Sequence, residues 1–197
     1  MLKVYKSIQE SFNFSYSVSK VNMPHVGNAD VSEFFTEDGR KYLIINDKNP
    51  YPLQKTFNGF YSSILDRDFI CYKLDFFMLK DPNKMPSPDN IVQIKASTPH
   101  AVKVFSTVIN YSKQFYANKT GIDMLIVSSF QGESGRLPLY TKLIKKLATE
   151  QGGILIGKIE DFIMFGSQFD LSITLHQDTI HELGINLEKF KQEFNIV

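Results

Sequence analysis

The stretch that decides the fold is residues 90–147, NIVQIKASTPHAVKVFSTVINYSKQFYANKTGIDMLIVSSFQGESGRLPLYTKLIKKL. Its first apolar run, Ile91 to Ile94, predicts a strand, and Ser97-Thr98-Pro99 then predicts the start of a helix with proline in the first helical position. A second strand is predicted over Met124–Val127 and, after a polar loop, a second helix that reaches Leu147. This order predicts a β–α–β–α unit, in which the ends of two neighbouring parallel strands and the start of the first helix form one site.

The first helix of this unit is expected to have one apolar face. Four large side chains recur at helical spacing: Val104, Val108, Tyr111 and Phe115. Polar side chains such as Lys103 and Gln114 occupy the positions between them. We therefore expect these four side chains to pack against the sheet.

Three segments of this stretch resemble one known family. They are AVKVFSTV at 101–108, MLIV at 124–127 and RLPLY at 136–140. Their order and spacing resemble the core of the GCN5-related N-acetyltransferase (GNAT) fold, and more closely the divergent acetyltransferase-like proteins encoded by bacteriophages. The resemblance implies an α/β fold with a mixed, mostly antiparallel central sheet and helices on both faces. We expect a single domain over residues 1–197, with a short helical extension from about 176 to 197.

The resemblance also implies acetyl-coenzyme A (acetyl-CoA) as a cofactor, bound where the first strand meets the first helix. The residues of this junction that we expect to contact it are Ile94, Lys95, Ser97, Thr98, His100 and Ala101. Hydroxyl and backbone N–H groups at a helix start can hold a phosphate, and Arg136 can bind one bidentately. Simpler roles stay open: Thr98 can cap the helix, His100 can be solvated, and Arg136 can pair with Glu133.

Three side chains are candidates for proton transfer. Tyr140 stands where the family's tyrosine can protonate the departing thiolate of coenzyme A, although it adjoins the apolar face of its helix and can be a packing residue. Asp75 or Glu133 can accept the proton of an amine, directly or through water. Asp75 can equally point to solvent from an alternating strand, and Glu133 can be an ordinary loop acid.

The junction departs from the pattern of active family members, because residues 96–101 contain no glycine and Pro99 lacks a backbone donor. Two classes of function therefore stay open. The chain is an acetyl-CoA-dependent N-acyltransferase of phage origin with a protein or small-molecule amine as acceptor, or it is a non-enzymatic virion component that contacts other phage structural proteins. A third alternative is an early phage protein that binds and inhibits a host factor.

Composition argues against several kinds of partner and site. The 197 residues carry a formal net charge of +1 with scattered Lys and Arg, so we expect no nucleic acid or membrane partner. The single cysteine, Cys71, excludes an intramolecular disulfide and is expected to be a buried, inert thiol. The four histidines lack the i,i+4 spacing of a helical zinc site. We expect the protein in the host cytoplasm, or in the virion if it is structural.

The rest of the chain predicts further strands and short helices. Strands are predicted at Phe12–Val18, Tyr42–Ile45, Phe69–Leu79, Ile154–Ile156, Phe162–Phe165 and Leu171–Leu175. Helices are predicted from Asp30, over Pro52–Leu65, and after an Asn186 cap. Together with the central unit, these strands would complete a mixed sheet.

Overall fold

The computed structural model describes residues 15–23, 29–48, 50, 67–87, 89–92, 100–130, 145–150, 152–164 and 167–197. The chain divides into two units, Met1–Ile45 with Phe76–Phe115 and Asn46–Asp75 with Tyr116–Val197. Strand β3 (Lys41–Lys48), strand β4 (Cys71–Leu79) and helix α3 (Ala101–Ala117) each contribute residues to both units. Each unit has an apolar cluster of its own.

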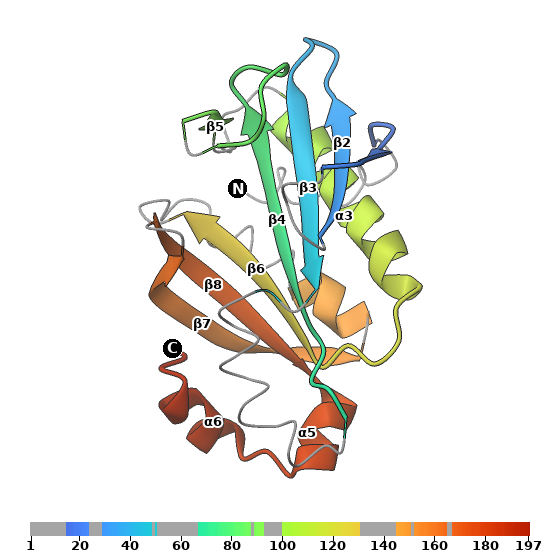
Figure 1. The fold of residues 1–197 in the computed structure, drawn as a ribbon. Coiled ribbons are helices and arrows are strands. Elements are labelled where there is room, and N and C mark those ends of the chain that lie inside the picture. Colours follow the sequence, from blue (N-terminus) through green and yellow to red (C-terminus); the bar gives the residue numbers. More distant parts are fainter. Residues whose placement is uncertain are drawn as a thin grey trace, which may run out of the picture. The chain divides into compact units, whose positions relative to one another are not determined.

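The first unit is built on strands that follow the order β1-β2-β3-β4. Strand β1 is Ser19–Val21, β2 is Asp30–Phe35, and the short β5 is Ile91–Val92 (Figure 1). The core of this unit consists of side chains from β2, β3 and β4: Val31, Leu43, Ile45, Phe77 and Leu79. The two residues from β3, and likewise the two from β4, are spaced by two positions, which places them on one face of the sheet.

The helix predicted from Asp30 is wrong, because this segment is strand β2. A turn at 36–40 connects it to β3, with the Thr36 N–H donating to the Arg40 carbonyl at 3.0 Å. Phe34 stacks on Tyr42 of β3 with ring centroids 5.0 Å apart. Such cross-strand aromatic contacts stabilise a sheet and outweigh the weak local preference of the segment for a helix. The strand predicted at Phe12–Val18 is only partly described, and its described residues, 15–18, lie outside any strand.

The predicted parallel partner of Met124–Val127 is also wrong. Strand β5 pairs antiparallel with β4, Met78 opposite Val92, whereas β6 (Met124–Phe130) pairs in parallel with β4, Cys71 opposite Met124. The physical reason lies in the proline-rich tract before β5, which folds back as a turn. The buried Asn90 side chain donates to main-chain carbonyls of this turn, including that of Met85 at 3.1 Å. Strand β5 is therefore a short hairpin addition to β4.

Helix α3 confirms the predicted apolar face only in part. Val104 and Val108 are fully buried, whereas Tyr111 and Phe115 are half-buried. The helix begins at Ala101, later than predicted, because His100 has a φ of 62° and so lies outside the right-handed helical region. In the first unit, Phe105 packs edge-on against Phe76 of β4 with ring centroids 5.5 Å apart. In the second, Tyr116 packs in the same way on Tyr72.

The second unit contains strands in the order β4-β6-β8-β7. Strand β7 is Gly153–Met164 and β8 is Ser167–His176; β8 pairs antiparallel with both β6 and β7. The strand predicted at Ile154–Ile156 and the described residues 162–164 of the next predicted strand are thus parts of one long strand, interrupted by irregularities at Leu155/Gly157 and Ile159/Phe162, whereas Phe165 lies outside the described residues. Residues 145–150 are helical, in agreement with the predicted second helix that reaches Leu147, and the Leu147 side chain is buried.

Two short helices follow β8 in the C-terminal part of the chain, α5 (Gln177–Leu183) and α6 (Leu187–Glu193) (Figure 1). The predicted Asn186 cap is confirmed, since its side chain accepts a hydrogen bond from the Lys189 N–H at 3.1 Å. Phe190 of α6 is buried in the same cluster as Cys71, on the face of β4 opposite the one that carries Tyr72. Helices therefore cover both faces of the strands in this unit.

The fold class predicted from the sequence is confirmed: an α/β protein with a mixed, mostly antiparallel sheet. None of the helices that the structure describes is both long enough and apolar enough to cross a membrane. The helix predicted over Pro52–Leu65 lies outside the described residues.

Candidate functional site

Three of the predicted site residues are described: Asp75 in the second unit, and His100 and Ala101 in the first. The other candidates lie outside the described residues: Tyr140, Glu133, Arg136, Ile94, Lys95, Ser97 and Thr98. The two groups of described candidates belong to separate units, and the local geometry of each is considered in turn.

Asp75 is held by a buried lysine on its own strand. Lys73 and Asp75 are two residues apart on β4, so their side chains lie on the same face. The Lys73 Nζ donates to Asp75 Oδ2 at 2.6 Å, with side chains 7% and 20% exposed, respectively. An ammonium group with so little contact with water requires a counter-charge, and Asp75 provides it.

The second oxygen of Asp75 is bound from the neighbouring strand. Leu74 is opposite Val127 in the parallel pair of β4 and β6, so the next residues along, Asp75 and Ser128, are neighbours too. The Ser128 hydroxyl donates to Asp75 Oδ1. Asp75 therefore does not simply point into water from an alternating strand. It is fixed by one donor from each of the two parallel strands.

Asp47, near the end of β3, is a second carboxylate on which the charges of Lys73 and Asp75 act. Burial raises the pKa of Asp47 above its ordinary value; the negative charge of Asp75 raises it further, and the positive charge of Lys73 opposes the shift. We call these four residues, Asp47, Lys73, Asp75 and Ser128, the Asp75 cluster. With all groups ionised, two carboxylates and one ammonium leave it with one net negative charge.

Sequence reasoning identified Asp75 but missed Asp47, Lys73 and Ser128. A signal for two of them was present, because Lys73 and Asp75 alternate within the otherwise apolar strand CYKLDFFML. Charged side chains at that spacing share a face and are seldom buried unless they are paired. Ser128 could be found only from the pairing of β6 with β4.

His100 and Ala101 are at the start of α3 in the first unit. His100 Nδ1 lies 3.8 Å from Glu37 Oε2, and the Lys103 Nζ donates to Glu37 Oε1. Tyr16 also donates its hydroxyl to Glu37, and its ring lies 4.1 Å from the Lys103 Nζ. Lys103 is the main cause that lowers the pKa of Glu37 to about 2. His100 is thus near a carboxylate, and the side chain of Ala101 is buried.

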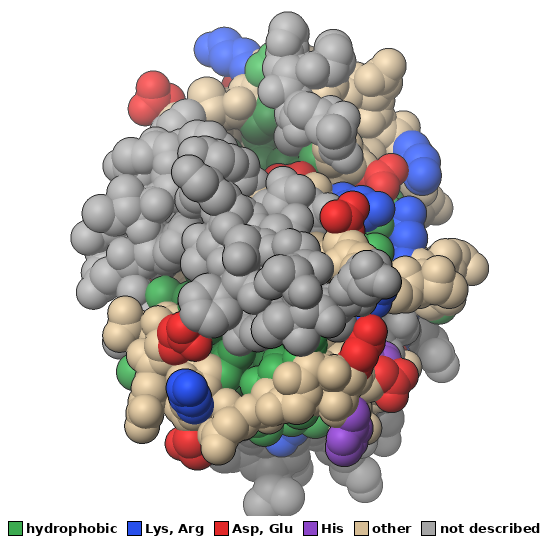
Figure 2. All heavy atoms as spheres, turned by 60° about the horizontal axis from the view of Figure 1, so that its bottom comes forward, with side chains coloured by type: hydrophobic (Ala, Val, Ile, Leu, Met, Phe, Trp, Pro, Cys, Tyr) green, Lys and Arg blue, Asp and Glu red, His purple; other side chains and the backbone are tan. Residues whose placement is uncertain are grey.

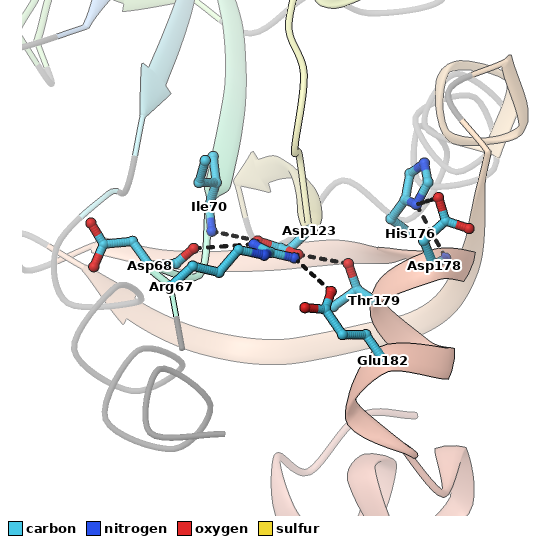
Figure 3. A network of polar contacts seen from close by, with 8 residues as sticks. All are labelled: Arg67, Asp68, Ile70, Asp123, His176, Asp178, Thr179 and Glu182. Atoms are coloured by element: carbon cyan, nitrogen blue, oxygen red, sulfur yellow. Dashed lines mark hydrogen bonds and ion pairs between the residues drawn. The ribbon is translucent and has the colours of Figure 1, made fainter. Parts of the chain in front are cut away.

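A second polar network in the second unit is centred on Asp123, which is 1% exposed (Figure 3). Arg67 donates to both carboxylate oxygens at 2.8 Å. The Ile70 N–H donates at 2.7 Å and the Thr179 hydroxyl at 2.6 Å. Asp123 therefore connects the segment before β4 with helix α5, and both of its carboxylate oxygens accept hydrogen bonds from donors of the chain itself.

A small pocket of about 70 Å³ lies next to this network and is lined by Lys119, Asp123, Thr174 and His176, among others. None of the three described site candidates lines it. Gly152 borders the ring of His176 so closely that a Cβ at this position would lie 2.8 Å from Nε2.

Cys71 is buried as predicted, and burial raises the pKa of its thiol, which keeps it protonated and unreactive. Among the described residues, no group of three or more His, Cys, Asp or Glu is arranged to hold a metal ion. On the face shown in Figure 2, basic and acidic side chains are interspersed, with no broad area of one sign among the coloured atoms.

No protein-family model matches the chain. No curated protein matches it either. Among solved structures, a protein assigned as a phosphinothricin N-acetyltransferase is similar, with 14% identity and a TM-score of 0.35 over 76% of this chain and 68% of that one. NAA60 of Arabidopsis thaliana in complex with acetyl-CoA is similar with 8% identity and a TM-score of 0.38, covering 76% of each chain. The same protein with a bisubstrate analogue gives 6% identity and a TM-score of 0.35. The solved structures named here are thus N-acetyltransferases, at identities and TM-scores that say nothing of what this chain binds.

Proposed function

We propose that this chain is an acetyl-CoA-dependent N-acyltransferase of bacteriophage origin, in which Asp75 accepts the proton of an amine acceptor. The observation that carries the proposal is the placement of Asp75. Its carboxylate is partly exposed, lies on one of two neighbouring parallel strands, and is oriented by Lys73 and by Ser128. A base for acyl transfer needs this combination of access and fixed geometry.

The proposed chemistry needs two proton transfers by residues of the chain. When bound, acetyl-CoA supplies the acyl group as a thioester. Asp75 takes one proton from the acceptor ammonium, which frees the nitrogen lone pair to form the new N–C bond as the C–S bond breaks. The nitrogen loses a second proton as the amide forms, and this proton balances the one that the departing sulfur takes up, so that the proton held by Asp75 is the only one released to water. We assign the donation to sulfur to Tyr140, and Glu133 is the alternative base.

Binding of the cofactor is assigned to the junction predicted from the sequence: Ile94, Lys95, Ser97, Thr98, His100 and Ala101, with Arg136. The described geometry is compatible with a contribution from the first turn of α3, since Lys103 places an ammonium group there and the His100 ring lies beside it. Glu37 already contacts both of them, so a phosphate at this position would compete with a carboxylate of the same chain.

The competing proposal is a non-enzymatic virion component, and one observation favours it. Both oxygens of Asp75 already accept hydrogen bonds from the chain itself, as they would in a purely structural ion pair. In that case the Asp75 cluster stabilises the sheet, and the chain acts through contacts with other phage proteins.

The deciding experiment measures acetyl-CoA binding by calorimetry and release of the coenzyme thiol with a panel of primary amines. If Asp75 is the base, Asp75→Asn should retain acetyl-CoA binding and lower turnover by about 10²–10⁴-fold. Glu188→Gln is a matched control, because this exposed acid of the same unit pairs only with Lys191 at 3.7 Å in the described structure. Absence of acetyl-CoA binding, together with recovery of the protein in purified phage particles, would establish the virion alternative.

Tyr140→Phe tests the second proton transfer. It removes the hydroxyl and keeps the ring, so a role as proton donor predicts normal acetyl-CoA binding with turnover lowered by about 10²–10⁴-fold. Unchanged turnover in this variant would show that Tyr140 is a packing residue.

A further inference from the structure

The small pocket next to Asp123 lies wholly within the second unit, and we call it the His176 pocket. Its volume of about 70 Å³ is roughly twice the share of one water in the liquid, about 30 Å³. It therefore has room for a small molecule. The lining comes from the end of α3, from β6, from β8 and from the helical residues 145–150: Tyr116, Lys119, Leu125, Ala148, Thr174 and His176, among others.

The His176 ring presents a hydrogen-bond donor that the described chain does not use. Its Nδ1 accepts a hydrogen bond from the Asp178 N–H at 3.2 Å, which fixes the ring as the cap of α5 (Figure 3). A backbone N–H can only donate, so the hydrogen of the neutral ring is on Nε2, and Nε2 keeps it when the ring is protonated. In the described part of the chain this Nε2–H has no hydrogen-bond partner.

The space beside this donor is open. Gly152 borders the ring, and a Cβ at that position would lie 2.8 Å from Nε2, so a residue with a side chain there would crowd the donor. The His176 side chain is 28% exposed, which leaves a route from solvent to the ring. A ligand can therefore reach Nε2.

The hydroxyl groups of the lining are already engaged. Thr174 and His176 are two residues apart on β8 and share a face, and Leu125 is opposite Thr174 in the antiparallel pair. The Thr174 hydroxyl donates to the Leu125 carbonyl at 3.0 Å, and the Tyr116 hydroxyl donates to Asn46 Oδ1 at 2.8 Å. The donor on this face that remains for a ligand is the Nε2–H, beside an apolar wall.

The charge of the lining favours an anion. Lys119 brings an ammonium group to the pocket. Asp123 lines it too, but Arg67 donates to both of its carboxylate oxygens at 2.8 Å and balances its charge. A negatively charged acceptor can use the Lys119 ammonium and the His176 Nε2–H together, and such charge-assisted hydrogen bonds are stronger than neutral ones.

We propose that the His176 pocket binds a short-chain carboxylate. The carboxylate accepts the hydrogen of His176 Nε2 and pairs with Lys119, and its aliphatic part packs on Leu125 and Ala148, which are 5% and 2% exposed. The volume limits that aliphatic part to about two or three carbons. This site is independent of the proposed acyl transfer, because none of the residues assigned to that reaction lines the pocket.

The first test compares a charged and a neutral probe of the same shape. Sodium propionate and propionamide are titrated into the full chain at pH 7 and constant ionic strength, with ¹H–¹⁵N NMR of the histidine rings as the readout. Propionate should shift the His176 Nε2 resonance to saturation. Propionamide should bind about fivefold more weakly or less, the effect of one unit charge at about 4 Å in water.

The second test removes the two polar contacts separately, with the backbone amides of Gly121 and Gly153 in the lining as the readout. His176→Asn should weaken propionate binding by about tenfold or more, the effect of one hydrogen bond to a charged group. The fold should be retained, because asparagine also caps a helix start. Lys119→Gln should weaken propionate binding by about fivefold and leave propionamide unchanged.

Lys191→Gln is the matched control, because it removes a lysine of the same unit that pairs with Glu188 at 3.7 Å, and it should leave both probes unaffected. Absence of saturable propionate binding, equal affinity for the two probes, or a propionate affinity unchanged in both pocket variants overturns the proposal. If circular dichroism shows that His176→Asn does not fold, Lys119→Gln alone decides: a selective loss of propionate binding supports the site, and unchanged binding overturns it.

Discussion

Asp123 and Asp47 are two carboxylates of the same unit with opposite surroundings. Asp123 is almost fully buried, and two guanidinium N–H groups, one backbone N–H and one hydroxyl fill its oxygens (Figure 3). Asp47 is also partly withdrawn from water, and burial raises its pKa, with no hydrogen bond of the described chain among the causes of that shift. A buried carboxylate with all of its donors stabilises the framework, whereas a carboxylate whose pKa is raised by burial lowers the stability of the fold when it is ionised.

The largest effect is expected at Asp123. Asp123→Ala leaves the Ile70 N–H and the Thr179 hydroxyl without their acceptor and removes the main partner of Arg67, so the free energy of unfolding should fall by about 3–5 kcal/mol. Denaturant titration measures this change in the free energy of unfolding. Glu182→Gln alters only the exposed edge of the same network and should cost less than about 1 kcal/mol. A loss below 1 kcal/mol for Asp123→Ala would contradict the structural role.

Truncation of a buried apolar side chain in the first unit provides a reference for the stability changes expected at the polar residues. Val108 is fully buried on α3, so Val108→Ala should cost about 1–3 kcal/mol through lost methyl contacts and an imperfectly closed cavity. Denaturant midpoints with an unchanged slope would show that only stability has changed. Val102→Ala, at a position of the same helix that is 45% exposed, is the matched control and should have little effect. A near-zero change for Val108→Ala would mean that this face of α3 is not packed.

Asp47→Asn should have the opposite sign. The raised pKa means that the ionised carboxyl destabilises the folded state at neutral pH, so its removal should increase the free energy of unfolding by about 1 kcal/mol or less at pH 7. The gain should shrink as the pH falls through the raised pKa and vanish below the ordinary value of 3.8, where the carboxyl is protonated in both states. Destabilisation at pH 7 would show that Asp47 has a structural partner.

Glu37 of the first unit should give the smallest effect. Its carboxylate is 55% exposed and binds Lys103 and Tyr16, and its pKa is lowered to about 2. A lowered carboxyl pKa stabilises the fold above the ordinary value of 4.5, and this contribution is lost as the pH falls through about 2. Glu37→Gln should therefore lower the melting temperature only slightly at pH 7 and not at all near pH 2. Thermal unfolding followed by circular dichroism at both pH values measures the change in melting temperature. A large decrease in the melting temperature at pH 7 would mean that this exposed carboxylate contributes as much to stability as a buried one.

Residues of the candidate site could be predicted from the sequence only where a local pattern distinguishes them. Asp75 was accessible to sequence reasoning because a single acid in an apolar strand is conspicuous. The role of Asp47 was not, because the same letter in the segment IINDK is typical of a strand end followed by a turn. The effect of the Lys73 and Asp75 charges on the pKa of Asp47 follows only once β3 and β4 are neighbours in the sheet.

The sequence by itself determined the elements whose cause is local. Strand β4 follows from its dense aromatic and β-branched residues, the inner side of α3 at Val104 and Val108 follows from helical periodicity, and α6 follows from the Asn186 cap. Only the tertiary structure decided that β6 pairs in parallel with β4 rather than with residues 91–94, and that the segment from Asp30 is a strand. Strand pairing joins residues about 50 positions apart and depends on cross-strand contacts, which no local periodicity encodes. The same long-range pairing placed Ser128 against Asp75, and so assembled the candidate site.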